Sequence, residues 1–297
     1  MGFRRRRRLG WFFTLVAIIA AIVGYLASTG RLAWLFGGNQ APLPVEGEAE
    51  FHFIDVGQGD AALIRTVQGH VLIDAGTNDS EDALIAYLKA EGIKELAYAV
   101  FTHPHEDHIG NARMLIESDT VGALILPPMH SDDMVYRMVL DAAAARNVPC
   151  HIADAGARFA VGDATLEILF ADAEAKEIND GSIICRLLYG KTAALFTGDA
   201  EGAAEQALLS AVPAEKLDCD LLKAGHHGSD TSLCEELLLA ASPTHVAISC
   251  GKENDYGFPH AALLGRLQAV GAVWHRTDEE GTLCYVSDGE SLVYKGE

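Results

Sequence analysis

The sequence lacks several features that mark particular classes of protein. None of its six cysteines belongs to a C-x-x-C pair, which argues against a zinc knuckle held by thiolates. No internal repeat or low-complexity tract follows the N-terminal segment, which argues against a repeat architecture. Four cysteines lie in apolar, strand-like runs, so we expect buried thiols rather than a disulfide framework: Cys185, Cys219, Cys250 and Cys284.

Positive charge is scarce beyond the first few residues. Five of the 22 Lys and Arg residues lie in residues 4–8, which leaves 17 against 42 Asp and Glu, a balance of −25 for residues 9–297. Nucleic-acid-binding domains usually carry a basic stripe, so broad electrostatic binding to a polyanion is not expected. A phosphodiester can still enter a site that holds divalent cations, because the ions dominate the local field. Elsewhere the acidic side chains are expected to form a solvated surface.

The N-terminal segment predicts a membrane anchor. The 22 residues from 9 to 30 carry no charge, and at about 1.5 Å per helical residue they can cross a hydrocarbon core of about 30 Å. The arginine run before them is expected to keep residues 1–8 cytoplasmic and to place the rest outside the cell. A cleaved signal peptide is the alternative, but no clear A-x-A site follows the apolar run. We therefore predict a single-pass protein of the cell membrane, with residues 31–47 as a linker before one domain at 48–297.

The domain after the linker predicts strands and helices in alternation. Residues 51–74 have the pattern of three antiparallel strands, and residues 80–91 have helical spacing with Gly92 as the stop. Strand and helix patterns then alternate to the C-terminus in two similar halves. This order predicts two mixed sheets packed face to face with helices outside. Polar residues recur where the strands end, which is where α/β folds gather ligands.

The densest group of potential metal ligands lies in residues 102–110, directly after an apolar strand-like run. His103 and His105 alternate along an extended turn and can present their rings to one side. Asp107 and His108 can then reach a second ion nearby. Imidazole and carboxylate together suit zinc or a similar first-row divalent ion, so a metal site is a better interpretation than a polar surface turn.

Other strand ends carry residues that fit the same site. Asp199 can be the N-cap of the helix that follows it, but beside a histidine cluster a carboxylate is a natural bridge between two cations, and we prefer that role. Asp74 is expected to hydrogen-bond a ligand histidine. His226 and His227 lie in a glycine-flanked loop, where we expect one to bind an ion and the other to face substrate.

Six segments in this order identify a family: FIDVGQGD at 53–60, LIDAG at 72–76, THPHEDHIG at 102–110, FTGDAE at 196–201, GHHGSD at 225–230 and RTD at 276–278. The chain from about residue 48 resembles the metallo-β-lactamase superfamily and, within it, the hydrolase-like domain of ComEC-type competence proteins. The resemblance implies an α/β fold, an αββα four-layer sandwich, with one or two divalent ions, Zn²⁺ or Mn²⁺, at its edge. Full competence channels also carry a multi-helix membrane domain, so a chain with one span is not expected to be the channel itself.

The resemblance also assigns roles to residues. It implies that Asp199 bridges two ions. For His227 we predict the role of a general acid or stabiliser. Many relatives have a further histidine for the first ion near residues 179–182, where this chain has none, so we expect the second ion to be held better. Relatives also tend to carry histidine in place of Phe258, and the sequence leaves open whether His260 substitutes. The remaining ligands implied are His103 and His105 for the first ion, and Asp107, His108 and His226 for the second.

These observations predict a membrane-anchored, extracytoplasmic, metal-dependent hydrolase that cleaves a phosphodiester. The ions would lower the pKa of a bound water and neutralise developing charge, and Asp107 and His227 are the residues to which we assign catalytic roles. DNA is the substrate class that the family most implies. Two alternatives stay open: hydrolysis of a small surface phosphoester, a lactone or an amide, and a non-catalytic role as partner of a DNA-uptake channel.

Overall fold

The computed structural model describes residues 41, 43–129 and 131–296. The predicted cytoplasmic segment at 1–8, the anchor at 9–30 and most of the linker at 31–47 lie outside these residues. In the ranges that are described, no helix is long and apolar enough to cross a bilayer. The fold below is that of residues 43–89 and 93–297, which group into one compact unit.

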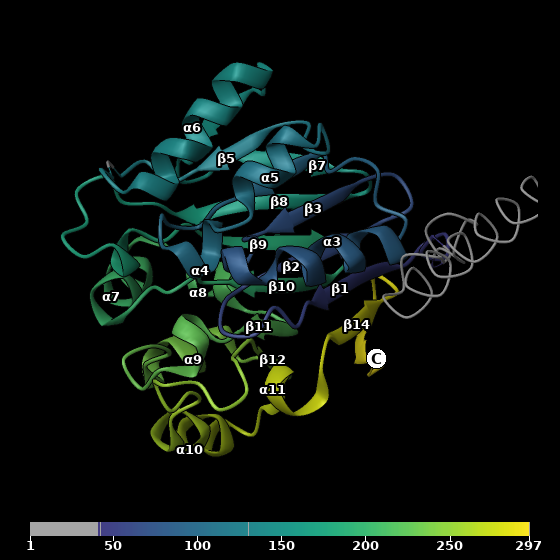
Figure 1. The fold of residues 1–297 in the computed structure, drawn as a ribbon. Coiled ribbons are helices and arrows are strands. Elements are labelled where there is room, and N and C mark those ends of the chain that lie inside the picture. Colours follow the sequence, from purple (N-terminus) through teal and green to yellow (C-terminus); the bar gives the residue numbers. More distant parts are fainter. Residues whose placement is uncertain (1–40, 42, 130, 297) are drawn as a thin grey trace, which may run out of the picture. The chain divides into compact units, whose positions relative to one another are not determined.

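An eight-stranded sheet takes most of its strands from the first half of the chain (Figure 1). Its order is β15-β14-β1-β2-β3-β4-β5-β6. The three predicted antiparallel strands are β1 to β3, and β3 to β6 then run parallel. The bounds are β1 Ala49–Phe53, β2 Ala62–Arg65, β3 His70–Ile73, β4 Tyr98–Val100, β5 Leu124–Leu126, β6 Cys150–Ile152, β14 Leu283–Ser287 and β15 Leu292–Tyr294.

The second sheet has seven strands in the order β13-β12-β11-β10-β9-β8-β7. Strands β7 to β10 are antiparallel, and β10 to β13 are parallel, so both sheets are mixed as predicted. The bounds are β7 Arg158–Val161, β8 Ala164–Phe170, β9 Ile184–Tyr189, β10 Thr192–Phe196, β11 Leu221–Lys223, β12 His245–Ile248 and β13 Val273–Arg276.

Alternating side chains on the strands bury both faces of each sheet. On β2, Ile64 packs in the core between the two sheets, whereas Leu63 packs against the helices outside. On β10, Phe196 faces the central core and Leu195 faces the outer one. Successive residues of a strand point to opposite faces, so apolar runs of this kind require a layer on each side.

The helices form the two outer layers. Helices α3 (Glu81–Ala90), α4 (Glu106–Ile109), α5 (Ala112–Glu117) and α6 (Met134–Arg146) pack on the first sheet, as Figure 1 shows. Helices α7 (Gly202–Ala211), α8 (Ala214–Leu217), α9 (Glu235–Ala241) and α10 (Ala261–Val270) pack on the second, and α11 (Thr277–Glu280) follows β13. The predicted αββα sandwich is confirmed, while the transmembrane helix predicted before it lies outside the described residues.

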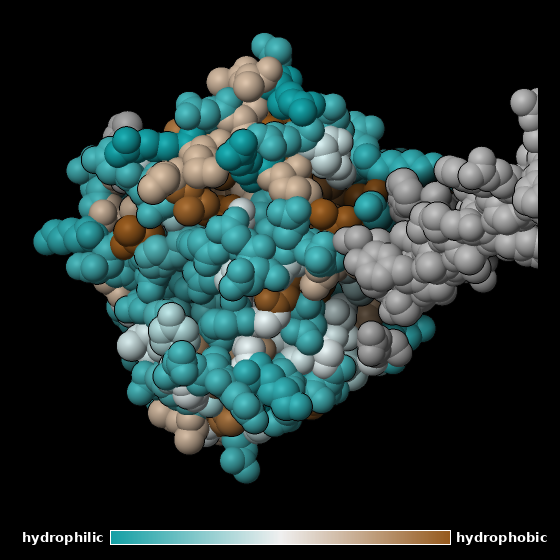
Figure 2. All heavy atoms as spheres, in the orientation of Figure 1, coloured by the Kyte–Doolittle hydropathy of each residue, from teal (hydrophilic) through white to brown (hydrophobic). Residues whose placement is uncertain are grey.

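The surface and the cysteines agree with what the sequence predicted, except at one cysteine. Figure 2 shows hydrophilic residues over most of the visible face of the described residues. No disulfide joins the cysteines among these residues, and Cys185, Cys219 and Cys250 are buried as expected. Cys284 is only partly buried, because it points away from the central core into which its neighbours Leu283 and Tyr285 pack.

Candidate metal centre

Loops that follow parallel strands bring the polar residues of the two sheets together. Strands β3 and β4 are parallel neighbours in one sheet, and β10, β11 and β12 are parallel neighbours in the other. Their carboxyl ends therefore lie at shared edges. Four buried residues each place one potential ligand atom within 4.8 Å of those of the other three: Asp60, His108, Asp199 and His227.

His108 is held by Asp74 so that one ring nitrogen is left for the cluster. The ring Nδ1 lies 2.8 Å from Asp74 Oδ2, and Asp74 also accepts hydrogen bonds from the Thr102 amide and hydroxyl, both at 2.8 Å. His108 Nε2 lies 3.2 Å from Asp199 Oδ1. Within the described residues, both of these buried atoms lack a hydrogen-bond partner. Buried polar atoms normally have partners, so the pair fits a site for a cation.

His227 faces the same place from the second sheet. Its ring is 1% exposed, and its Nδ1 donates to the Ser249 carbonyl at 3.1 Å. Its Nε2 then lies 3.2 Å from Asp107 Oδ2 and 3.6 Å from Asp199 Oδ2. His108 and His227 thus turn their Nε2 atoms toward Asp199, and His227 also faces Asp107. Carboxylates and imidazole nitrogens together suit a divalent ion.

His226 approaches Asp199 as well. Its Nε2 lies 3.8 Å from Asp199 Oδ2, its Nδ1 lies 2.8 Å from Glu201 Oε1, and its side chain is 24% exposed. The resemblance implied His226 as a partner of Asp107, but the structure places His227 there. Both histidines have a left-handed backbone, with φ of 48° and 52°, and their ring planes differ by 64°. Each such residue costs about 1–3 kcal/mol, which is typical of functional loops.

His103 and His105 form another pair of rings near Asp199. His103 Nε2 is 3.0 Å from His105 Nδ1 and 3.9 Å from Asp199 Oδ2. Donor atoms around one ion with bonds of about 2.1 Å lie about 3–4 Å apart, so these distances fit a second cation. We therefore group the candidate ligands into two sets around Asp199: Asp107, His108 and His227, called the inner side, and His103, His105 and His226, called the outer side.

The segment where relatives have a further histidine contacts the outer side indirectly. Asn179 Nδ2 donates to Glu201 Oε1 at 3.2 Å, and Glu201 faces His226. Asp180 accepts from the amides of Glu201 and Ala204 at the start of α7. Asp180, and not Asp199, therefore binds the amides at this helix terminus, which leaves the Asp199 carboxylate for the cluster.

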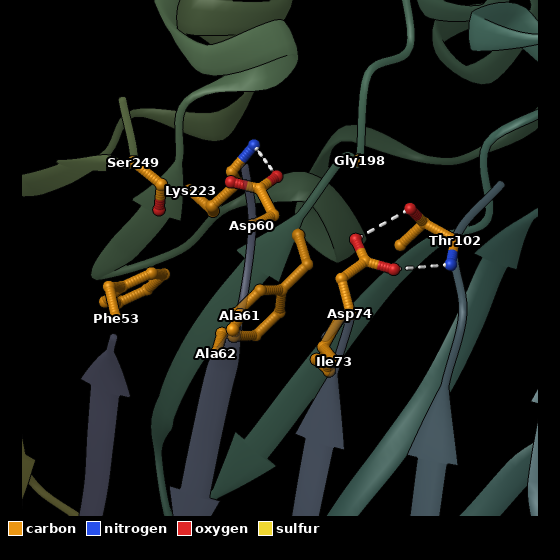
Figure 3. A pocket seen from close by; sticks show the side chains of 11 residues that line it. Phe53, Asp60, Ala61, Ala62, Ile73, Asp74, Thr102, Gly198, Lys223 and Ser249 are labelled. Atoms are coloured by element: carbon orange, nitrogen blue, oxygen red, sulfur yellow. Dashed lines mark hydrogen bonds and ion pairs between the residues drawn. The ribbon is translucent and has the colours of Figure 1, made fainter. Parts of the chain in front are cut away.

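Sequence reasoning missed a buried ion pair behind the histidines. Asp60 forms an ion pair with Lys223, the last residue of β11, and both are about 95% buried (Figure 3). Asp60 also lies 3.7 Å from His108 Nδ1 and 3.5 Å from His227 Nδ1, on the ring edges opposite the Nε2 atoms. Its position thus suits a residue that supports the ligand histidines. The available signals were a carboxylate in a Gly-Asp turn and a lysine that ends an apolar strand.

Gly59 allows the turn after β1 to approach the loop that carries Asp107. Gly59 has φ of +150°, and a Cβ atom there would lie 2.6 Å from the Asp107 carbonyl oxygen. The next amide, of Asp60, donates to that carbonyl at 3.0 Å. The turn after β1 is therefore packed directly against the loop that carries Asp107.

Charges in the cluster shift the pKa values in a way that favours a cation. Burial alone would lower the pKa of His227, but Asp199 and Asp60 raise it to about 9. Burial would also lower the pKa of His108, yet Asp199 and Asp74 raise it well above its usual value. By contrast, burial and the charge of His108 hold the pKa of His103 well below its usual value. The inner carboxylates thus attract positive charge, and a metal ion would displace protons from these rings.

The carboxylates themselves stay ionised. Burial would raise the pKa of Asp60, but Lys223 and His227 lower it to about 2. Burial would raise the pKa of Asp107 and Asp199 as well, and the neighbouring histidines lower both. Asp60, Asp107 and Asp199 thus favour their charged forms, and cations at the site can offset this charge.

His260 does not join this cluster in its observed contacts. Its Nδ1 lies 3.0 Å from Asp230 Oδ1, and its Nε2 lies 3.2 Å from the Tyr256 carbonyl. Phe258, where relatives tend to have histidine, places its ring centroid 5.4 Å from that of His226 and 6.1 Å from that of His227. An aromatic ring, rather than an imidazole, therefore borders the centre at this position.

Comparison with known proteins agrees with the fold and the cluster. Residues 54–252 match the family model of the metallo-beta-lactamase superfamily. The chain is 32% identical over 257 residues to ComE operon protein 3 of Bacillus subtilis, which covers 80% of this chain and 33% of that protein. It is 31% identical over 241 residues to competence protein ComA of Neisseria gonorrhoeae, with coverage of 80% and 32%. The chain thus spans about a third of the length of these relatives.

Solved structures share the architecture at low sequence identity. The metallo-beta-lactamase fold protein YhfI from Bacillus subtilis aligns with a TM-score of 0.56 at 12% identity, over 80% of this chain and 100% of that one. CmlA, a diiron beta-hydroxylase from Streptomyces venezuelae, aligns with a TM-score of 0.51 at 14% identity, over 83% and 57%. The chain's relatives of known sequence include competence proteins, and its fold carries a cluster of His and Asp residues at the edge of the sandwich. Together with the match over residues 54–252, this shows that the chain belongs to the metallo-beta-lactamase superfamily.

Proposed function

We propose that this protein is a metal-dependent phosphodiesterase that acts outside the cell, anchored to the membrane by its N-terminal segment. The observation that supports this most strongly is the pair of ligand groups that share Asp199. A centre of this kind holds two cations close together, and such centres serve displacement at phosphorus because they neutralise charge and lower the pKa of water.

The proposed ligand sets follow the two sides of the cluster. Nitrogen and carboxylate donors suit Zn²⁺ or Mn²⁺, and we assign one or two such ions to the centre. Asp199 is the shared ligand. The inner ion takes Asp107, His108 and His227, and the outer ion takes His103, His105 and His226.

The position of His227 suits a ligand better than the general acid predicted from the sequence. Its ring is buried, one nitrogen donates to the Ser249 carbonyl, and the other faces Asp107. A general acid must reach the leaving group of a substrate, which a ring held on both edges does not do. We therefore retain Asp107 and His227 as residues essential for activity and place His227 among the inner ligands. Asp74 orients His108 from behind.

A phosphodiester is the substrate class best supported by the charges and the relatives. The balance of −25 leaves few Lys and Arg residues to hold an anion, so the cations of the centre would bind the phosphate. The matched relatives include ComE operon protein 3, competence protein ComA and recombination protein 2, whose names place them in competence and recombination. DNA is accordingly the substrate that we propose.

Hydrolysis by the metal-loaded full chain tests this function. Bis(p-nitrophenyl) phosphate and single-stranded DNA are supplied with Mn²⁺ or Zn²⁺, and bound metal is measured in parallel. We expect turnover by the wild type and a loss of about 10³-fold in Asp107→Ala, since several kcal/mol of charge stabilisation are removed. Asp132→Ala, which changes an exposed aspartate on the β5–α6 connection, should leave activity unchanged.

Two outcomes would favour the alternatives. Stoichiometric metal without turnover of any phosphodiester, small phosphoester, lactone or amide would contradict catalysis and favour a non-catalytic partner of a DNA-uptake channel. Turnover restricted to a small phosphoester, a lactone or an amide would keep the hydrolase and replace its substrate class.

A further inference from the structure

Two aromatic rings extend from the proposed metal centre toward solvent. The Phe258 ring borders His226 and His227, with its plane 32° from that of His227. Tyr256 stacks on Phe258, with centroids 5.3 Å apart and planes 11° apart. Tyr256 is 65% exposed, so one side of this stack is open to solvent. None of the ligand contacts described above uses these two rings.

The loop that carries the rings is held in place by its own side chains. Asn254 Nδ2 donates to the carbonyls of Gly251 and Phe258 at 2.9 and 2.8 Å, and Asn254 Oδ1 accepts from the Phe258 amide at 2.9 Å. The His260 amide donates to the Gly228 carbonyl at 2.9 Å, which ties the loop to the segment after His227. The rings are therefore positioned before any ligand arrives, which lowers the entropy cost of binding.

We propose that Tyr256 and Phe258 form a stacking platform for a nucleobase of the substrate, and this rests on the phosphodiesterase function proposed above. Every base has a flat face, and aromatic side chains bind single-stranded nucleic acid by stacking on such faces. The platform lies next to the histidines of the centre, so the base would belong to a nucleotide that flanks the scissile phosphate.

The arrangement of the rings favours a flat ligand over a quaternary ammonium. Cages for such cations surround them with several aromatic faces. Tyr256 and Phe258 are nearly parallel and present one flat surface rather than the walls of a cage. A nucleobase therefore fits better than a choline group.

The charges around the platform explain why stacking would be needed. Glu253 and Asp255 precede Tyr256 in the exposed part of the loop, with Lys252 as the cation of that stretch. Lysine and arginine contacts to phosphates make nucleic-acid binding strongly salt-dependent. A platform that binds bases supplies affinity without such contacts, so we expect a shallow dependence of KM on salt.

Paired substrates with and without bases test the platform. The metal-loaded full chain is given an oligothymidylate and an abasic oligonucleotide of equal length, which has the same phosphates. Tyr256→Ala should raise KM for the oligothymidylate about 5- to 150-fold, with kcat within about twofold and the abasic KM unchanged. Tyr256→Phe keeps the ring and should match the wild type. Leu239→Ala, an exposed apolar residue of α9, is the control for general surface changes.

The failure of this proposal can be told apart from failure of the proposed function. If no phosphodiester is cleaved, the function fails, and fluorescence anisotropy of the labelled oligothymidylate and abasic probe with the same variants still decides the platform. Equal affinity for the two probes in the wild type, or no change in Tyr256→Ala, overturns it. A preference for p-nitrophenyl phosphorylcholine that Tyr256→Ala abolishes would overturn it as well, in favour of a cation site.

Discussion

The two sides of the metal centre differ in how their ligands are supported. On the inner side, His108 is held by Asp74 and His227 by the Ser249 carbonyl, with the Asp60 carboxylate behind both rings. On the outer side, His226 faces Glu201, which is 31% exposed. Residues that hydrogen-bond to metal ligands orient those ligands and change the metal affinity. The number of ligands therefore does not by itself tell which of two sites binds its ion more tightly. We expect the inner ion to be held more tightly.

Removal of the shared carboxylate should have the largest effect. Asp199→Ala takes a ligand from both sides and leaves the buried histidines without their main counter-charge. We expect the loss of both ions and a fall in phosphodiester hydrolysis of about 10³-fold or more. Metal content of the purified protein, measured by mass spectrometry, checks this. One tightly bound ion in the variant would show that the inner side does not need Asp199.

Loss of the supporting ion pair should destabilise the fold itself. Lys223→Met leaves Asp60 as a buried charge without its partner, which typically costs about 3–5 kcal/mol. Urea denaturation in the presence of a chelator measures this without a contribution from metal. Adding Asp60→Asn should recover much of the loss. Lys191→Met, which breaks an exposed pair with Glu290, should cost about 0–1 kcal/mol. Equal costs for the two lysine variants would contradict the importance of burial.

The carboxylate behind His108 should affect the inner side alone. Asp74→Asn weakens the acceptor that fixes the His108 ring, and changes of this kind reduce metal affinity about 10- to 100-fold. Calorimetric titration of the metal-free protein should show one weakened binding event and one unchanged event. Weakening of both events would mean that the two sides act as one site.

The outer side should respond least to loss of its support. Glu201→Gln keeps the size of the side chain near His226 and removes its charge, and because this group is partly exposed we expect less than about a tenfold change in outer-ion affinity. The same titration measures it, with Asp74→Asn as the matched comparison. If Glu201→Gln lowered metal affinity more than Asp74→Asn does, the outer side would depend on its supporting residue more than the inner side.

Local sequence patterns predicted much of the fold. Alternating apolar residues predicted the three opening strands, and helical spacing predicted the helix after residue 80. The same two patterns predicted the alternation of strands and helices that follows. Strand ends rich in histidine and aspartate also predicted where ligands would gather, because parallel strands deliver their carboxyl ends to one edge. The residues at 102–110, Asp74 and Asp199 were all found in this way.

The remainder of the site depends on contacts between distant segments. The pairing of Asp60 with Lys223 joins residues 163 positions apart across the two sheets, and no local pattern encodes it. The Tyr256 and Phe258 rings reach the centre because the Asn254 loop is tied to Gly228. Sequence alone left open whether His260 substitutes for the histidine that relatives carry in place of Phe258, whereas its contacts join it to Asp230.

The sequence by itself determined the two sheets with helices outside and the place of a candidate metal centre, since apolar periodicity defines layers and parallel strands gather polar residues where they end. Only the tertiary structure decided which histidine belongs to which side. His226 and His227 are adjacent and chemically identical, and their left-handed backbones turn their rings apart. That conformation is held by the packing of their loop against both sheets, which no short stretch of sequence contains.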